Sequence, residues 1–190
     1  MKQWPHSPVH IVDESGTFMV TAATYKKQHF FNSERKIQFL HDTMLEKSAE
    51  LGWQLQAWAV FPNHYHFLAI SPDHPENLPV LIRKIHGATS KRVNDEDDAA
   101  GRKIWFQYWD SRITYQSSYY ARLNYVHNNP VHHGVVDNSL KYKWCSASWF
   151  EKASEESFRK TVSSFKTDRI KIPDDFWSAA IHRRFACAAN

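Results

Sequence analysis

Apolar and aromatic residues gather in four short runs that are typical of β-strands, because they are rich in β-branched and aromatic side chains. The runs cover 17–25, 54–61, 64–70 and 104–113. Only Pro62 and Asn63 separate the second run from the third, and such a pair is typical of a tight turn. The two middle strands are therefore expected to form an antiparallel hairpin.

Apolar residues at helical spacing mark the segments between these strands. A first helix is expected to follow a cap at Asn32 or Ser33 and to run to Leu51. A second helix is expected from 78 to about 93, with Asn77 as its cap. Each helix has one apolar face, so both are expected to cover a sheet.

A third helix is expected after the last strand, capped by Ser117 or Ser118 and ending near Asn128 or Asn129. Pro130 fixes this end, because proline disfavours helical backbone at the residue before it. The order β-α-β-β-α-β, followed by a helix, predicts an α+β chain of the ferredoxin-like kind, with helices on one face of an antiparallel sheet. Many functions occur on this fold, so the fold alone does not select one.

The composition excludes several classes of protein but does not identify a function. The 190 residues carry 24 Lys and Arg against 20 Asp and Glu, so the net charge of +4 permits a polyanionic partner but does not require one. Two distant cysteines, Cys145 and Cys187, exclude a disulfide scaffold and a cysteine zinc motif. No stretch predicts a membrane span or a signal peptide, so the reducing cytoplasm is expected. The acidic run 95–98 is expected to be a solvated loop rather than a metal site.

The first candidate for chemistry is the pair His64 and His66 in the third strand. Residues two apart on a strand point to the same face, so both imidazoles could hold one metal ion. In a chain with 12 His, one such spacing is also expected by chance. The alternative is a pair of strand histidines that are hydrogen-bonded to their neighbours.

The second candidate is a face of the third helix that carries Arg122, Tyr125 and Asn129 at positions i, i+3 and i+7. A phenol can attack phosphorus, a guanidinium can bind phosphate, and an amide oxygen can ligate a hard cation. The alternative is an amphipathic tyrosine beside a helix-terminal asparagine. His127 lies about 200° around the helix from Tyr125, so it is expected to be a surface or packing residue.

Four segments in order resemble one family. They are 61–68 (FPNHYHFL), 105–113 (WFQYWDSRI), 125–134 (YVHNNPVHHG) and 143–148 (KWCSAS). They resemble the HUH single-tyrosine DNA transposases, which are IS200-like, and within them the branch of REP-associated tyrosine transposases. The resemblance covers about 17–148 and implies three parts: an arm at 1–16, the HUH transposase domain at 17–148, and a basic tail with short helices at 149–190.

The resemblance implies a mechanism and a site. His64 and His66 would hold Mg²⁺ or Mn²⁺, with Asn129 at the position of a polar third ligand, where many relatives carry the longer glutamine. Tyr125 would attack the phosphorus of single-stranded DNA, become linked to the 5′-phosphate and release a 3′-hydroxyl. A second 3′-hydroxyl could then reverse the step and join new ends. Two residues depart from the family pattern: Tyr65, which is expected to pack in the core, and Asn124, where many relatives carry arginine.

The resemblance also implies a partner, namely single-stranded DNA with a hairpin, in the bacterial nucleoid and away from membranes. Lysine and arginine side chains would contact its phosphates, and each of them has a solvated helix or loop position as the alternative. The candidates are Arg122, Arg83, Lys84, Lys91, Arg92, Lys26 and Lys27. A homodimer in which one tyrosine helix serves the partner's histidines is a further possibility.

Two other functions remain open from the sequence. The first is a hairpin-binding module on the same fold that has lost catalysis, and it predicts binding that needs neither metal nor Tyr125. The second is a metal phosphodiesterase in which the histidines activate water, and it predicts cleavage without a covalent intermediate. The presence of His64, His66 and Tyr125 together argues against the first. The lack of further Asp or Glu near either motif argues against the second.

Overall fold

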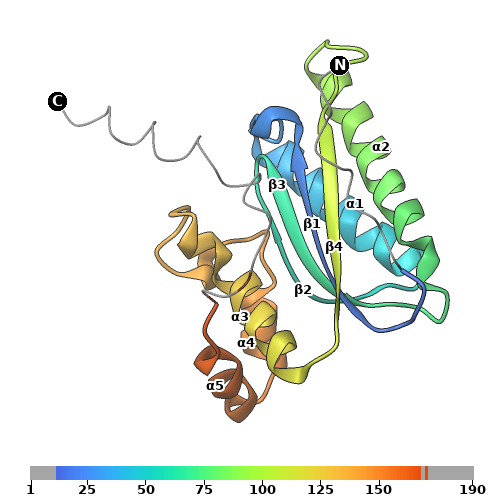
Figure 1. Ribbon diagram of the computed structural model, residues 1–190. Helices are drawn as coiled ribbons and strands as arrows, with labels where there is room; N and C mark the ends of the chain where they lie inside the picture. The colour runs from blue at the N-terminus through green and yellow to red at the C-terminus, as the bar shows by residue number, and fades with distance from the viewer. Residues whose placement is uncertain (1–11, 168–169, 171–190) are drawn as a thin grey trace, which may run out of the picture.

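The computed structural model describes residues 12–167 and 170 (Figure 1). The strands are β1 (Thr17–Thr24), β2 (Gln54–Val60), β3 (His64–Ile70) and β4 (Trp105–Ile113). The helices are α1 (Glu34–Glu50), α2 (Leu78–Glu96), α3 (Gln116–His132), α4 (Ala147–Ala153) and α5 (Glu156–Ser164). Three 3₁₀ turns are η1 (Tyr25–Lys27), η2 (Pro75–Asn77) and η3 (Ser139–Lys141). Along this described part, no helix has the length and apolar character to cross a bilayer.

The four strands form one sheet in the order β2-β3-β1-β4. Every neighbouring pair is antiparallel, including the expected hairpin of β2 and β3. Because β1 lies between β3 and β4, the chain has the ferredoxin-like arrangement, and the predicted α+β fold is confirmed.

The sheet separates two apolar clusters. Tyr65 and Phe67 of β3 lie in the cluster under α1 and α2, where Tyr65 is fully buried as expected. Leu68 lies in the other cluster, with Leu123 and Val126 of α3. In Figure 1, α1 and α2 accordingly cover one face of the sheet, and α3, α4 and α5 lie on the other. The alternation along β3 therefore directs its even-numbered residues, the two histidines included, toward α3.

The predicted helix caps have different outcomes. Ser33 caps α1, because its hydroxyl accepts a hydrogen bond from the backbone N–H of Lys36 at 3.3 Å. Asn77 makes no such bond at the start of α2. Its side chain instead accepts from the Trp53 indole at 2.6 Å and donates to the Leu51 carbonyl at 3.2 Å. Asn77 therefore occupies the predicted N-cap position, but its amide joins the end of α1 to the start of α2 instead of capping the helix.

Helix α2 is longer than expected and takes in the start of the acidic run. Asp95 lies one turn after Lys91 and pairs with it at 2.6 Å, which stabilises the last turn. Asp97, just after the helix, pairs with Lys36 and Arg102. These two carboxylates are therefore paired with cations. Asp95 and Glu96 lie in the helix, so the predicted loop is wrong for the first half of the run.

Helix α3 continues past Pro130, so its predicted end is wrong. Proline lacks the N–H that would bind the carbonyl of Val126 four residues earlier, and the thiol of Cys145 approaches that carbonyl at 3.7 Å. The helix ends after His132, where Gly134 has a φ of +65° and its N–H bonds the Val131 carbonyl at 2.9 Å. A glycine in this left-handed conformation is a common helix stop.

The segment after α3 packs back onto it. His127 is buried and stacks on Phe150 of α4 with ring centroids 4.5 Å apart, so it is a packing residue as expected. Asn124 donates to the Phe165 carbonyl at 2.8 Å and so ties α3 to the end of α5. The division into arm, domain and tail stays a prediction, because residues 1–11 and most of the basic tail lie outside the described residues.

His86 should make the fold sensitive to acid. Its ring is half-buried and stacks on Trp105, with centroids 4.2 Å apart, and is hydrogen-bonded to the Tyr65 hydroxyl at 3.0 Å. Burial lowers the pKa of His86 to about 3. Between its ordinary pKa of about 6.5 and this value, the unfolded chain binds a proton that the folded chain does not, so stability falls as pH falls.

The wild type should take up one proton at His86 when it unfolds between pH 4 and 6. We therefore expect His86→Gln to reduce the slope of the unfolding free energy against pH by about 1.4 kcal/mol per pH unit in this range. Urea titrations at several pH values measure this slope. His74→Gln is the control, because the His74 side chain is exposed. An unchanged slope in His86→Gln would show that His86 is charged in the folded protein.

Candidate metal and tyrosine site

His64 and His66 lie on the face of β3 that α3 covers. Both are buried, with 6% and 0% of their surfaces exposed, and their ring centroids are 5.1 Å apart. Each Nδ1 has a neighbour at 2.7 Å, which is Asn63 Oδ1 for His64 and Thr21 Oγ1 for His66. When Nδ1–H donates to these oxygens, the lone pair of each ring is on Nε2, which is the form in which histidines bind metals.

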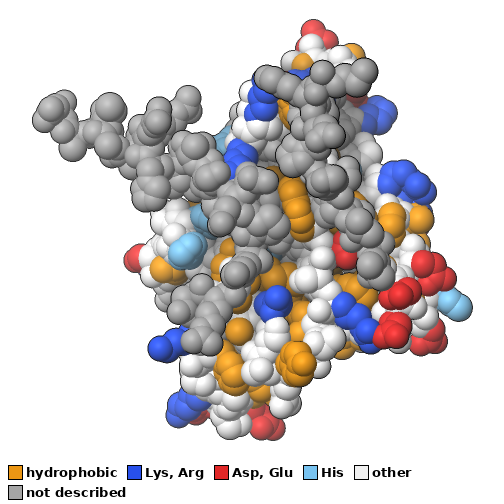
Figure 2. Space-filling model, in the orientation of Figure 1, with side chains coloured by type: hydrophobic (Ala, Val, Ile, Leu, Met, Phe, Trp, Pro, Cys, Tyr) orange, Lys and Arg blue, Asp and Glu red, His pale blue; other side chains and the backbone are white. Residues whose placement is uncertain are grey.

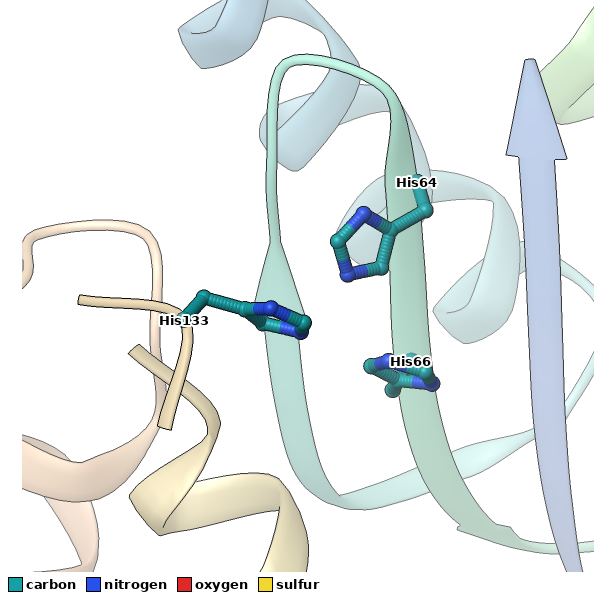
Figure 3. Close-up of side chains that lie close together, drawn as sticks. All are labelled: His64, His66 and His133. Carbon is teal, nitrogen blue, oxygen red and sulfur yellow. The ribbon is translucent and has the colours of Figure 1, made fainter. Parts of the chain in front are cut away.

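A third imidazole, from His133, meets this pair. Figure 3 shows the three rings converging, two from β3 and one from the segment just after α3. One ring nitrogen from each lies within 4.8 Å of the others, a grouping that could hold a metal ion. His133 was not among the residues predicted from the sequence, because Pro130 placed the predicted end of the third helix before it. Gly134, a helix-stop residue directly after it, is the signal that could have found it.

The surroundings keep the three histidines neutral. Burial lowers the pKa of His66 to about 3 and that of His133 to about 4. The pKa of His64 is lowered well below its ordinary value, first by burial and then by the charges of neighbouring groups, including His66, His133 and Lys27. Neutral imidazole is the metal-binding form, so the site needs no proton release at neutral pH.

Tyr125 of α3 lies beside the histidines. Its ring centroid is 5.6 Å from that of His66, and the two rings meet edge to face. Burial raises the pKa of Tyr125 to about 12, and the nearby Asn129 side chain opposes this rise. The sequence placed Tyr125 and His66 in separate motifs, and the packing of α3 on the sheet brings them together.

Asn129 is completely buried one turn after Tyr125. Its amide is near enough to the phenol to lower the Tyr125 pKa. Even so, within residues 12–167 neither of its amide atoms makes a hydrogen bond of ordinary length and angle. The contact is therefore close but imperfectly aligned, and both amide atoms remain available to a bound group.

Three of the predicted DNA-binding cations, Arg122, Lys27 and Lys26, lie on α3 and η1. Arg122, half-buried one turn before Tyr125, donates to the carbonyl and the hydroxyl of Ser118, and burial lowers its pKa. Lys27 of η1 is close enough to depress the pKa of His64, and its carbonyl accepts from the Asn63 amide at 3.3 Å. Lys26 precedes it and lies over the Tyr25 ring at 5.5 Å. Lys27 therefore lies near His64, Arg122 lies on the tyrosine helix, and Lys26 contacts Tyr25.

The four predicted cations of α2 lie elsewhere. Helix α2 covers the opposite face of the sheet from α3, so the structure does not bring its side chains to the histidines. Lys84 pairs with Glu50, Lys91 with Asp95, and Arg92 with Glu96. Arg83 lies on the same helix. On the face in Figure 2, where grey residues do not cover it, Lys and Arg side chains are scattered among hydrophobic and acidic ones.

Two known proteins are similar to this chain. The REP-associated tyrosine transposase of Escherichia coli K12 is 27% identical over 101 residues, which cover 52% of this chain and 57% of that protein. The chain thus matches little more than half the length of this relative. A solved REP-associated tyrosine transposase bound to a REP hairpin has a TM-score of 0.64 with this chain. The match covers 78% of this chain and 86% of that one at 18% identity, so it establishes the fold alone.

The sequence model of the family described as "Transposase IS200 like" matches residues 15–129. This range contains all four strands, the histidine pair and Tyr125, and it is more than half of the chain. The chain therefore belongs to the IS200-like transposase family.

Proposed function

We propose that the chain is a metal-dependent endonuclease and strand transferase of the bacterial nucleoid, which recognises hairpins in single-stranded DNA and cleaves through a 5′-phosphotyrosine. The observation that carries the proposal is the edge-to-face contact of Tyr125 with His66, at 5.6 Å between ring centroids. It brings a phenol next to a cluster of neutral imidazoles that could hold a metal ion. The similar protein solved with a REP hairpin supports the choice of DNA substrate.

The donor set could hold a divalent ion, for which the family resemblance implies Mg²⁺ or Mn²⁺. His64 and His66 would hold it from β3, and a third donor would come from the end of α3, where Asn129 and His133 are the two candidates. Such an ion polarises a phosphate oxygen and stabilises the charge that develops there. The side-chain oxygens of Asn63 and Thr21, which contact the Nδ1 atoms, would orient the two β3 rings.

Tyr125 would supply the nucleophile. Its Oη forms a bond to phosphorus while the bond from phosphorus to the 3′ oxygen breaks, and the leaving 3′ oxygen takes a proton. A phenol with a pKa of about 12 is ionised in about one molecule in 10⁵ at pH 7. The phenolate would need local positive charge, and α3 carries one arginine, Arg122, one turn before Tyr125. A 3′-hydroxyl of another strand can then attack the phosphotyrosine and release Tyr125.

The site is built from one chain. Tyr125 and the three histidines all belong to the same copy, so a partner's tyrosine helix is not needed to complete it. This arrangement favours cleavage by a single protomer. A homodimer stays a prediction, and mixing Tyr125→Phe with His66→Ala protein tests it, since only shared sites would regain activity.

The test uses end-labelled single-stranded oligonucleotides that carry REP-type hairpins and random flanks, with Mn²⁺ or with EDTA. The proposal predicts a metal-dependent protein–DNA adduct that survives a denaturing gel. Cleavage without an adduct would indicate attack by water. Tight hairpin binding that needs no metal, with no cleavage of any flank in the library, would indicate a binding module.

Lys27 is expected to contact a DNA phosphate near the histidines. We expect Lys27→Gln to weaken hairpin binding and to reduce the slope of log K against log salt by about 0.7, the value for one phosphate of a single strand. Lys91→Gln is the matched control, because Lys91 is on α2 across the sheet. Equal losses in both variants would mean that the DNA also reaches α2, as the sequence reasoning predicted.

A further inference from the structure

The third donor of the site decides which metal it prefers. Both β3 rings offer nitrogen, and a nitrogen donor from His133 or an oxygen donor from Asn129 would give different selectivity. The ring of His133 is in place for this, since its centroid is 5.0 Å from that of His64. His133 and Asn129 differ in the contacts that hold their side chains.

His133 is fixed at the end of α3. Its backbone N–H bonds the Asn129 carbonyl at 2.9 Å, and Gly134 turns the chain directly after it. The edge of its ring meets Phe61 at 5.1 Å, and Phe61 also stacks on His64 at 4.5 Å. The same phenylalanine therefore positions two of the three imidazoles, which makes the cluster preorganised for one ion.

Asn129 has a different neighbour. Its amide lies against the Tyr125 phenol, one helical turn away, and the contact favours the ionised phenol. An N–H that points at the phenol oxygen would hold Tyr125 in position and stabilise its charge during attack. His133 can thus ligate the metal while Asn129 positions the Tyr125 phenol.

We propose that His133 completes a three-imidazole metal site with His64 and His66, and that the site prefers first-row ions such as Co²⁺ or Zn²⁺ to Mg²⁺. Nitrogen ligands favour these two ions, whereas Mg²⁺ prefers oxygen ligands and gives up water reluctantly. The inference rests on the metal site of the proposed function but not on DNA cleavage.

The test is metal binding by the full chain without DNA. After EDTA dialysis, Co²⁺ is titrated and its visible absorption followed for the wild type, His133→Phe, Asn129→Ala and His132→Ala. Phenylalanine keeps the ring contact with Phe61 but cannot ligate, and His132 is the exposed neighbour that serves as control. We expect Co²⁺ affinity to fall about 10-fold or more in His133→Phe and to stay within about twofold in the other two variants.

Two further readouts make the result decisive. Histidine ring NMR signals of the wild type should shift for His133 together with His64 and His66 on adding Zn²⁺, which needs no variant to fold. Zn²⁺ or Co²⁺ should also raise the melting temperature more than Mg²⁺ at equal concentration. The proposal would be overturned if His133→Phe bound Co²⁺ as tightly as the wild type, or if Asn129→Ala lost Co²⁺ binding. It would also be overturned if Mg²⁺ raised the melting temperature as much as Zn²⁺ or Co²⁺ did. Metal binding as expected with no DNA cleavage would refute the proposed function alone.

Discussion

Tyr125→Phe should lose DNA cleavage and the covalent adduct by at least about 10³-fold, because it removes the oxygen that attacks phosphorus. The phenyl ring remains, so the packing against His66 and the fold should persist. Hairpin binding should stay within a few fold of the wild type. Single-turnover cleavage of a labelled hairpin oligonucleotide, resolved on a denaturing gel, measures the rate.

Tyr120→Phe is the matched control. Tyr120 lies on the same helix, but its ring meets Phe158 and its hydroxyl accepts from Gln116 at 2.8 Å, away from the histidines. This variant should cleave at nearly the wild-type rate. Cleavage that survives in Tyr125→Phe and is lost in Tyr120→Phe would move the nucleophile to the earlier tyrosine.

His66→Ala is expected to reduce metal-dependent cleavage by about 10²-fold or more, because it removes one of the proposed metal ligands. His66 is completely buried and adjoins both Tyr125 and His64. The hairpin should still bind, because phosphate contacts come from other side chains. Cleavage rates over a series of Mn²⁺ concentrations measure the effect, and added Mn²⁺ should restore little of the rate.

The control for this variant is Tyr65→Phe, the neighbouring position on β3. Its side chain points to the opposite face of the sheet, where its hydroxyl bonds His86. We expect Tyr65→Phe to cost about 1 kcal/mol of stability, the value of one hydrogen bond, and to leave cleavage unchanged. A similar loss of cleavage in both variants would mean that His66→Ala acts through the fold rather than the metal.

Local patterns predicted most of the fold because the elements depend on local chemistry. The turn Pro62-Asn63 specified the hairpin, and Ser33 specified the start of α1. Tertiary contacts decided the remaining boundaries. Asn77 bonds Trp53 instead of capping α2, and α3 passes Pro130 because Cys145 approaches the carbonyl that proline leaves without a donor. Neither contact can be read from neighbouring residues.

The candidate site was predicted in part. Motif spacing was enough to select His64, His66 and Tyr125, and their side chains lie together in the structure. The spacing could not reveal His133, whose approach depends on where α3 ends and how that end packs on Phe61. The α2 cations were chosen for charge alone. Helix α2 packs on the face of the sheet that carries Tyr65, which is opposite to the face of the histidines. This packing depends on the assembled fold and cannot be read from the sequence of α2.

The most direct test of the central claim is the chemical identity of the adduct. After reaction with a hairpin oligonucleotide and Mn²⁺, trypsin and nuclease digestion should yield the peptide 123–141 carrying a 5′-linked nucleotide, and Tyr125 is the only tyrosine in that peptide. Mass spectrometry with fragmentation should place the added mass on Tyr125 and find none after EDTA treatment. Cleaved DNA with a free 5′-phosphate and an unmodified peptide, or a nucleotide on a different residue, would contradict the account.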